Sequence, residues 1–137
     1  MPRFAIMLFA IALMAPQPGA AAGDPERGED LYERRCFACH SLDANRVGPA
    51  HRGVFGRKAG AVPGYNYSPA LKRSEIVWDE ATLDKWLTNP QALIPGQRMG
   101  FRLGDAVERA DIIAFLKRES AAGSSAQSLS SGRPRER

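Results

Sequence analysis

The sequence predicts an all-α domain of three or four helices joined by long ordered loops. Apolar residues recur three and four positions apart in three segments, near residues 25–35, 79–87 and 105–118. Strand-like alternation is absent from residues 41–69, which instead contain five glycines and three prolines. An ordered loop of this length normally has a function, and wrapping a cofactor is one such function.

The first helix is predicted to begin after Asp24, which can cap it, with Pro25 at the first helical position. It runs to about Arg35. Gly28 lies inside it, where glycine costs roughly 1 kcal/mol relative to alanine, so the sequence favours a close helix crossing at this point.

The next two helices also carry start and stop signals. Asp79 can cap the second, and Asn89-Pro90 ends it. Asp105 and Glu108 have the spacing of a capping box, after which apolar residues follow at helical spacing before Lys117-Arg118.

The two ends differ in composition from the domain between them. Residues 4–15 are twelve apolar residues after Arg3, and small residues follow up to Ala22, which is typical of a cleaved signal peptide over residues 1–22. An uncleaved anchor is the alternative, although a membrane-spanning helix needs about 20 residues. Residues 120–137 are rich in Ser, Ala and Arg, and we expect a disordered tail there.

The domain is therefore expected over residues 23–119. The chain has 19 Lys and Arg and 15 Asp and Glu; four of the basic residues and one acidic residue lie outside this domain, which leaves 15 and 14. The basic balance of the whole chain comes largely from its tail. Aromatic residues are not interleaved with a basic stripe, so no nucleic-acid partner is expected.

The pattern Cys36-Phe37-Ala38-Cys39-His40 predicts covalent attachment of a c-type haem. The two thiols can each add to a vinyl group of the porphyrin, and the adjacent histidine is carried under the iron as a ligand. A redox disulfide and a zinc site are the alternatives. The first lacks βαβ patterning around it, and the spacing of His51, the chain's only other histidine, fits no ribbon or finger.

The second axial ligand is expected from a methionine or from His51. Met99 is the only methionine outside residues 1–22, and it follows Pro95-Gly96, which would fix the turn that presents it. We therefore expect Met99 as the ligand. A histidine such as His51 is more often a hydrogen-bonded structural residue.

The segments around these residues closely resemble the class I cytochromes c, in particular the mitochondrial type and the bacterial cytochromes c2. The match extends over nearly all of residues 24–118. It is carried by Cys36 to His40, Gly48-Pro49, residues 55–60, residues 63–68, Ile76, Trp78, residues 83–90, residues 94–101 and residues 109–116.

The resemblance implies a cytochrome c fold wrapped around one covalent haem c, with Cys36 and Cys39 as its attachment points and His40 and Met99 as axial ligands. It also implies that the carbonyl oxygen of Pro49 accepts the Nδ1 hydrogen of His40. Four side chains would serve the buried haem propionate: Arg57, Tyr67, Trp78 and Gln97.

The resemblance further implies that the first and last helices cross, with Gly28 and Tyr32 meeting Ile112 and Phe115, and that Phe101 covers the Met99 side. Three positions depart from the family pattern. Trp86 replaces a tyrosine that bonds the methionine sulfur, Leu71 replaces an asparagine of a water network, and His51 stands where an aliphatic residue usually closes the pocket.

With both axial positions filled, we expect a one-electron carrier in the periplasm that is a monomer and not an enzyme. The resemblance implies transient electrostatic docking to membrane redox complexes of the respiratory chain or photosynthesis, namely a quinol-oxidising complex, a terminal oxidase or a photosynthetic reaction centre. A periplasmic dehydrogenase is another partner. A haem enzyme or gas sensor, with Met99 readily displaced, is the alternative class. The candidate docking residues are Arg46, Lys58, Lys72, Arg73, Arg98 and Arg102.

Overall fold

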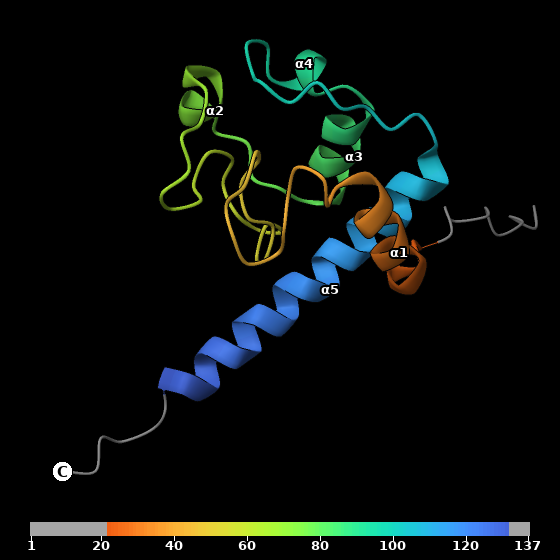
Figure 1. Ribbon diagram of the computed structural model, residues 1–137, viewed down its shortest axis with the longest axis vertical. Coiled ribbons are helices and arrows are strands. Elements are labelled where there is room, and N and C mark those ends of the chain that lie inside the picture. The colour runs from red at the N-terminus through yellow and green to blue at the C-terminus, as the bar shows by residue number, and fades with distance from the viewer. Residues whose placement is uncertain (1–21, 132–137) are drawn as a thin grey trace, which may run out of the picture.

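The computed structural model describes the backbone of residues 22–131 and the side chains of residues 22–125. Its helices, in chain order, are α1 (Pro25–Arg35), α2 (Pro69–Arg73), α3 (Glu80–Thr88), α4 (Pro90–Leu93) and α5 (Ala106–Ser131), as Figure 1 shows. Within this range, the only strand-like pairing is a single bridge between Lys58 and Val77. The all-α prediction is confirmed. Residues 1–21, which hold nearly all of the predicted signal peptide, and residues 132–137 lie outside the described part.

The three longer helices α1, α3 and α5 lie where the sequence predicts helices. The short helices α2 and α4 bring the count above the expected three or four. Each begins at a proline after a capping side chain, since Ser68 accepts from the backbone N–H of Leu71 and Asn89 accepts from that of Ala92. Cap and proline together suffice for a single turn.

The predicted caps of the longer helices are all present. The Asp24 carboxylate accepts from the backbone N–H of Glu26 at 2.9 Å. Asp79 forms a reciprocal capping box with Thr82. Asp105 accepts from the N–H groups of Val107 and Glu108 at 2.8 and 3.0 Å, so each of these helices starts where an aspartate binds its free donors. The other half of the capping box expected here is not observed, because the Glu108 carboxylate pairs with Arg35 of α1.

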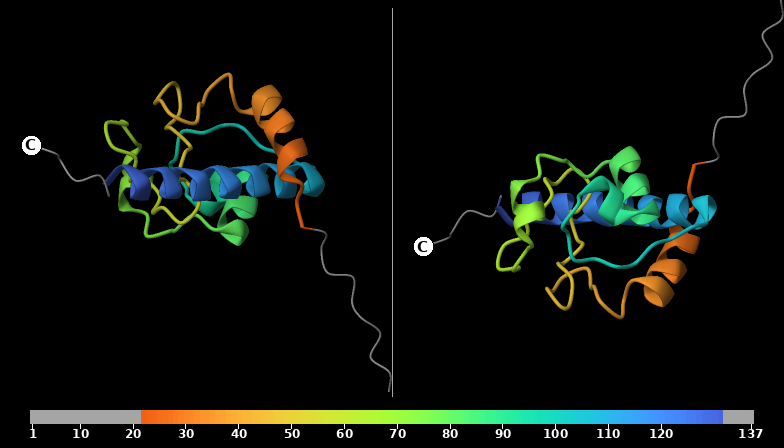
Figure 2. Two further views of the ribbon diagram at one scale, coloured as in Figure 1. Left: turned by 90° about the horizontal axis from the view of Figure 1, so that it is seen from below. Right: turned by 90° about the horizontal axis from the view of Figure 1, so that it is seen from above.

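Helices α1 and α5 cross closely, as both views in Figure 2 show. At the crossing, a Cβ on Gly28 would lie 2.0 Å from the carbonyl oxygen of Asp111, so no larger residue fits. Tyr32 packs on Phe115 with ring centroids 5.2 Å apart. The close crossing that Gly28 predicts is therefore observed.

The end of α5 differs from the sequence prediction. The sequence predicts a disordered tail from Ser120, but α5 continues to Ser131. Ser120 is buried, and its hydroxyl accepts from the backbone N–H of Phe55 and donates to the carbonyl of Leu116. This tertiary bond fixes the helix past Glu119, and adding residues to a formed helix costs little. No helix among the described residues is long and apolar enough to cross a membrane.

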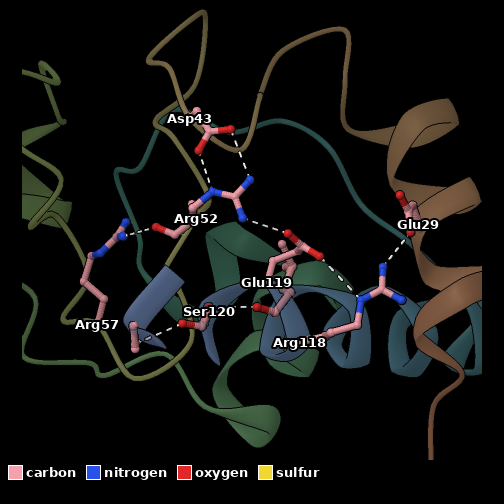
Figure 3. A network of polar contacts seen from close by, with 9 residues as sticks. Glu29, Asp43, Arg52, Arg57, Arg118, Glu119 and Ser120 are labelled. Atoms are coloured by element: carbon pink, nitrogen blue, oxygen red, sulfur yellow. Dashed lines mark hydrogen bonds and ion pairs between the residues drawn. The ribbon is translucent and has the colours of Figure 1, made fainter. Parts of the chain in front are cut away.

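A polar network ties α5 to the loop that follows the haem motif (Figure 3). The Arg52 guanidinium donates to Asp43 and, at 2.8 Å, to Glu119 of α5. Arg118 pairs with both Glu119 and Glu29 of α1. The loop is thereby anchored to both crossing helices.

Candidate functional site

A cavity of about 480 Å³ opens into the middle of the domain. Its walls are mostly apolar, and several core side chains form them, including Trp78, Leu83 and Ile112. The predicted attachment and ligand residues all line this one cavity: Cys36, Cys39, His40 and Met99.

The end of α1 presents the first three of these residues. The C-cap of α1 is Cys36, whose N–H donates to the carbonyl of Tyr32, and the N–H groups of Cys39 and His40 both donate back to the Cys36 carbonyl. This turn fixes the two sulfurs and the imidazole relative to each other. Both thiols are free, and burial raises the pKa of Cys36 to about 12.

The imidazole of His40 is held in one orientation. Its Nδ1 lies 2.9 Å from the carbonyl oxygen of Pro49, the contact that the family resemblance implies. With the Nδ1 hydrogen donated to that carbonyl, Nε2 is left free to bind a metal. Burial lowers the pKa of His40, which favours the neutral, metal-binding form.

Gly48 explains why the backbone can approach His40 so closely. A Cβ at this position would lie 2.1 Å from Cε1 and 2.5 Å from Nδ1 of the ring. The N–H of Gly48 also donates to the carbonyl of Cys39. Only glycine allows this segment to pack on the His40 ring.

Met99 lies in the segment between α4 and α5. The side-chain amide of Gln97 bonds both backbone groups of Met99: its Nε2 donates to the carbonyl at 2.8 Å, and its Oε1 accepts from the N–H. Gln97 is not among the residues that line the cavity, and its Nε2 also donates to the side chain of Gln91 at 3.1 Å. The contact of Gln97 with a propionate stays a prediction.

The three other residues expected at the propionate line the cavity. The Arg57 guanidinium donates to the backbone carbonyls of Ala50 and Arg52. Tyr67 is buried with its hydroxyl near the N–H of Val62, and burial raises its pKa, so it stays protonated. Trp78 is buried beside them. A cation and a hydroxyl facing an apolar cavity suit a carboxylate.

The three departures from the family pattern also line the cavity. Leu71 adds only apolar surface. Trp86 is buried and packs on Trp78 with ring centroids 5.2 Å apart. His51 stacks on His40 with centroids 4.0 Å apart and an interplanar angle of 21°.

Sequence reasoning missed the partner of His51. The hydroxyl of Tyr32 lies 3.0 Å from His51 Nδ1, although the sequence places Tyr32 only at the helix crossing. The two residues are 19 positions apart, and no local pattern links them. The signal was the histidine itself, since a polar group at a position that is usually aliphatic needs a buried partner.

The donor set fits a covalently bound haem. Two thiols, an imidazole with a free Nε2 and a thioether face one apolar cavity, and a cationic and a phenolic side chain line the same cavity. The fold and site therefore define a small all-α protein that carries a haem attached to its own chain.

Comparison with known proteins leads to the same class of protein. The cytochrome c family model matches residues 25–120, and the chain belongs to the cytochrome c family. Proteins of this family are electron carriers that bind haem c covalently through a cysteine pair, which is present here as Cys36 and Cys39.

Individual relatives resemble almost the whole domain. The chain is 45% identical over 120 residues to a cytochrome c2 of Rhodomicrobium vannielii, which covers 85% of this chain and 95% of the relative. It is 44% identical to a cytochrome c type-1 of Ascaris suum over 74% of this chain and 94% of the relative. Among solved structures, cytochrome cH from Methylobacterium extorquens matches with a TM-score of 0.67 and 44% identity, over 70% of this chain and 99% of that one.

Proposed function

We propose that this protein is a periplasmic one-electron carrier that uses a single covalent haem c with His40 and Met99 as axial ligands. The observation that carries the proposal is that one apolar cavity holds the cysteine pair, an imidazole with Nδ1 already bonded, and a methionine whose backbone is held on both sides by Gln97. The haem supplies the reversible change of its iron between the ferrous and ferric states.

The protein's own residues support this reversible change by filling both axial positions of the haem iron. The His40 ring is held by Pro49 and the backbone of Met99 by Gln97, so the two groups that carry the proposed ligand atoms are fixed in place. No open position is then left for a substrate or a gas. A thioether ligand and an apolar pocket both favour the reduced state, which suits a carrier of high potential.

Ligand binding tests this proposal against the haem enzyme or gas sensor. The ferric protein is expected to show the weak far-red charge-transfer band that reports a sulfur ligand, and the ferrous protein is expected not to bind carbon monoxide at neutral pH. Met99→Ala is expected to lose the band and gain carbon monoxide binding. Rapid binding of carbon monoxide by the unmodified ferrous protein would contradict a carrier.

Export is the second part of the proposal, and it rests on residues 1–22 and on the cysteine chemistry. Covalent haem attachment is expected outside the bacterial cytoplasm, in the compartment to which a cleaved signal peptide leads. N-terminal sequencing of the purified protein tests it. A start near Gly23 in a periplasmic fraction is expected, and Met1 retained in a membrane fraction would contradict it.

The partners are proposed to be membrane complexes, namely a quinol-oxidising complex and a terminal oxidase or photosynthetic reaction centre, or else a periplasmic dehydrogenase. A monomer that docks transiently through exposed cations fits all of them. Among the candidates, Lys58 is paired with Glu75 at 2.8 Å. The remaining exposed candidates are Arg46, Lys72, Arg73, Arg98 and Arg102.

Salt dependence tests the docking. The rate of electron transfer to an acidic partner is expected to fall as ionic strength rises, because screening weakens steering between exposed charges. Comparing donors in a membrane extract would identify the partner as the complex that reduces this protein fastest. A rate that does not change between low and high salt would exclude electrostatic docking.

A further inference from the structure

We infer that Tyr32 and His51 form a hydrogen-bonded pair that positions the haem ligand His40 and stabilises the ferric state. The inference rests on the proposed axial role of His40 and goes beyond it, because it assigns a function to two residues that bind no iron themselves.

The first step is the contact between the two histidines. The ring of His51 stacks on that of His40 at 4.0 Å and 21°. His40 is already fixed at Nδ1 by Pro49 and has Gly48 packed on it. The stacked ring of His51 is thus a second contact on the His40 ring, beside the Pro49 bond, and it further restricts tilting and rotation of the ring plane.

The second step is that His51 itself is held in place. Its Nδ1 bonds the Tyr32 hydroxyl at 3.0 Å, and its backbone N–H donates to the carbonyl of Ser41 at 3.0 Å. The next residue, Arg52, is anchored to Asp43 and Glu119, which Figure 3 shows. The segment that carries His51 is thus fixed at both its side chain and its backbone.

The third step is that Tyr32 cannot readily release His51. Tyr32 lies on α1 with only 3% of its surface exposed, and its ring packs on Phe115 of α5. Burial raises the pKa of Tyr32, so the hydroxyl keeps its proton and remains a hydrogen-bonding group. A chain of contacts therefore runs from the crossing of α1 and α5 to the ligand ring.

The consequence for the iron follows from polarity. The imidazole of His51, with the Tyr32 hydroxyl bonded to it, stands beside His40 where the family pattern has an aliphatic side chain, and polar groups near the haem favour its more highly charged ferric form. Removing the pair is expected to shift the equilibrium toward the ferrous form and to let the plane of His40 turn slightly within the limits set by its Pro49 bond.

The test uses the exported, haem-containing full chain in four forms: unmodified, Tyr32→Phe, His51→Leu, and the double variant. Thr88→Val is the control, because it also deletes one hydroxyl hydrogen bond, to the carbonyl of Asp84, at a position that does not line the cavity. The haem-methyl ¹H shifts of the ferric protein report the plane of the axial histidine. The ratio of ferrous to ferric protein at a fixed solution potential reports the equilibrium.

Tyr32→Phe is expected to change the haem-methyl pattern and to raise the ferrous to ferric ratio about threefold, the size expected for one lost hydrogen bond. In the His51→Leu background the same change is expected to have no effect beyond that of Thr88→Val, since the hydroxyl acts through His51. If His51→Leu fails to retain haem, His51→Phe replaces it, because phenylalanine cannot bond the Tyr32 hydroxyl.

Two results would overturn the inference: a Tyr32→Phe protein with the methyl pattern and ratio of the control, or an equal effect of Tyr32→Phe with and without His51. Failure of the proposed function is distinguishable from both. It would appear as carbon monoxide binding by the unmodified ferrous protein, whereas the pair is judged by how the methyl shifts differ among the four forms.

Discussion

Replacing Gly48 with alanine is expected to displace His40, the proposed axial ligand. Gly48 has no positive φ, so alanine meets no backbone strain there, and the cost is steric. The new Cβ would lie 2.1 Å from Cε1 of His40, whereas ordinary contacts begin at 3.4 Å, so the gap must open by 1.3 Å. A movement of that size breaks the 2.9 Å contact with Pro49.

The free-energy cost has two parts. Forcing extra volume into a packed site costs about 1–3 kcal/mol, and the lost hydrogen bond adds about 1 kcal/mol. Gly48→Ala is therefore expected to lower the free energy of unfolding by about 2–4 kcal/mol. Guanidinium unfolding of the ferric protein, followed by far-ultraviolet circular dichroism, measures this change.

Gly104→Ala is the matched control, since a Cβ there meets nothing within 4 Å and its φ is not positive. It is expected to change the free energy of unfolding by less than about 0.5 kcal/mol. If Gly48→Ala is as stable as Gly104→Ala and keeps the haem spectrum of the unmodified protein, the packing of Gly48 on His40 is refuted.

Three further outcomes are expected. Gly28→Ala places a Cβ 2.0 Å from a backbone carbonyl oxygen of α5 and is expected to lower the free energy of unfolding by about 3 kcal/mol, which chemical unfolding measures. A decrease of less than about 1 kcal/mol would contradict the close crossing. The hydrogen bond from Arg27 lowers the pKa of Asp111 in the folded protein. The stability that this pair contributes is therefore complete above the unfolded pKa of about 3.9 and is lost as pH falls through the lower folded value. Asp111→Asn is expected to be less stable than the unmodified protein at pH 7 and to approach its stability in acid, and a constant difference in stability from pH 7 to pH 3 would exclude this linkage. Acid acetone is expected to leave the colour in the protein pellet, and only replacing both Cys36 and Cys39 is expected to release it; colour leaving the unmodified protein would exclude thioether bonds.

Features set by neighbouring residues could be predicted from the sequence. The caps at Asp24, Asp79 and Asp105 depend on donors two or three positions away, so their sequence signals suffice. The haem motif is equally local, because five consecutive residues specify both the attachment points and one ligand. Met99 could be predicted as the second ligand because it is the only one of the four methionines that lies outside residues 1–22.

Features set by distant contacts could not be predicted. A serine-rich segment indicates disorder, yet Ser120 bonds Phe55, 65 positions away, and this contact carries α5 past the expected boundary. The bond from the Gln97 amide to Met99 spans only two positions, but no sequence signal distinguishes it from the propionate contact that the family resemblance implies. The contact between Tyr32 and His51 depends on how α1 faces the following loop, which no periodicity encodes.

The central claim is that His40 and Met99 both ligate one covalently attached haem, and proton NMR of the ferrous protein tests it most directly. A methionine bound to haem iron lies over the porphyrin, whose ring current shifts its methyl signal far upfield. We predict one such signal in the unmodified protein and none in Met99→Ala. A ferrous spectrum without that signal, in a protein that binds carbon monoxide at neutral pH, would contradict the account.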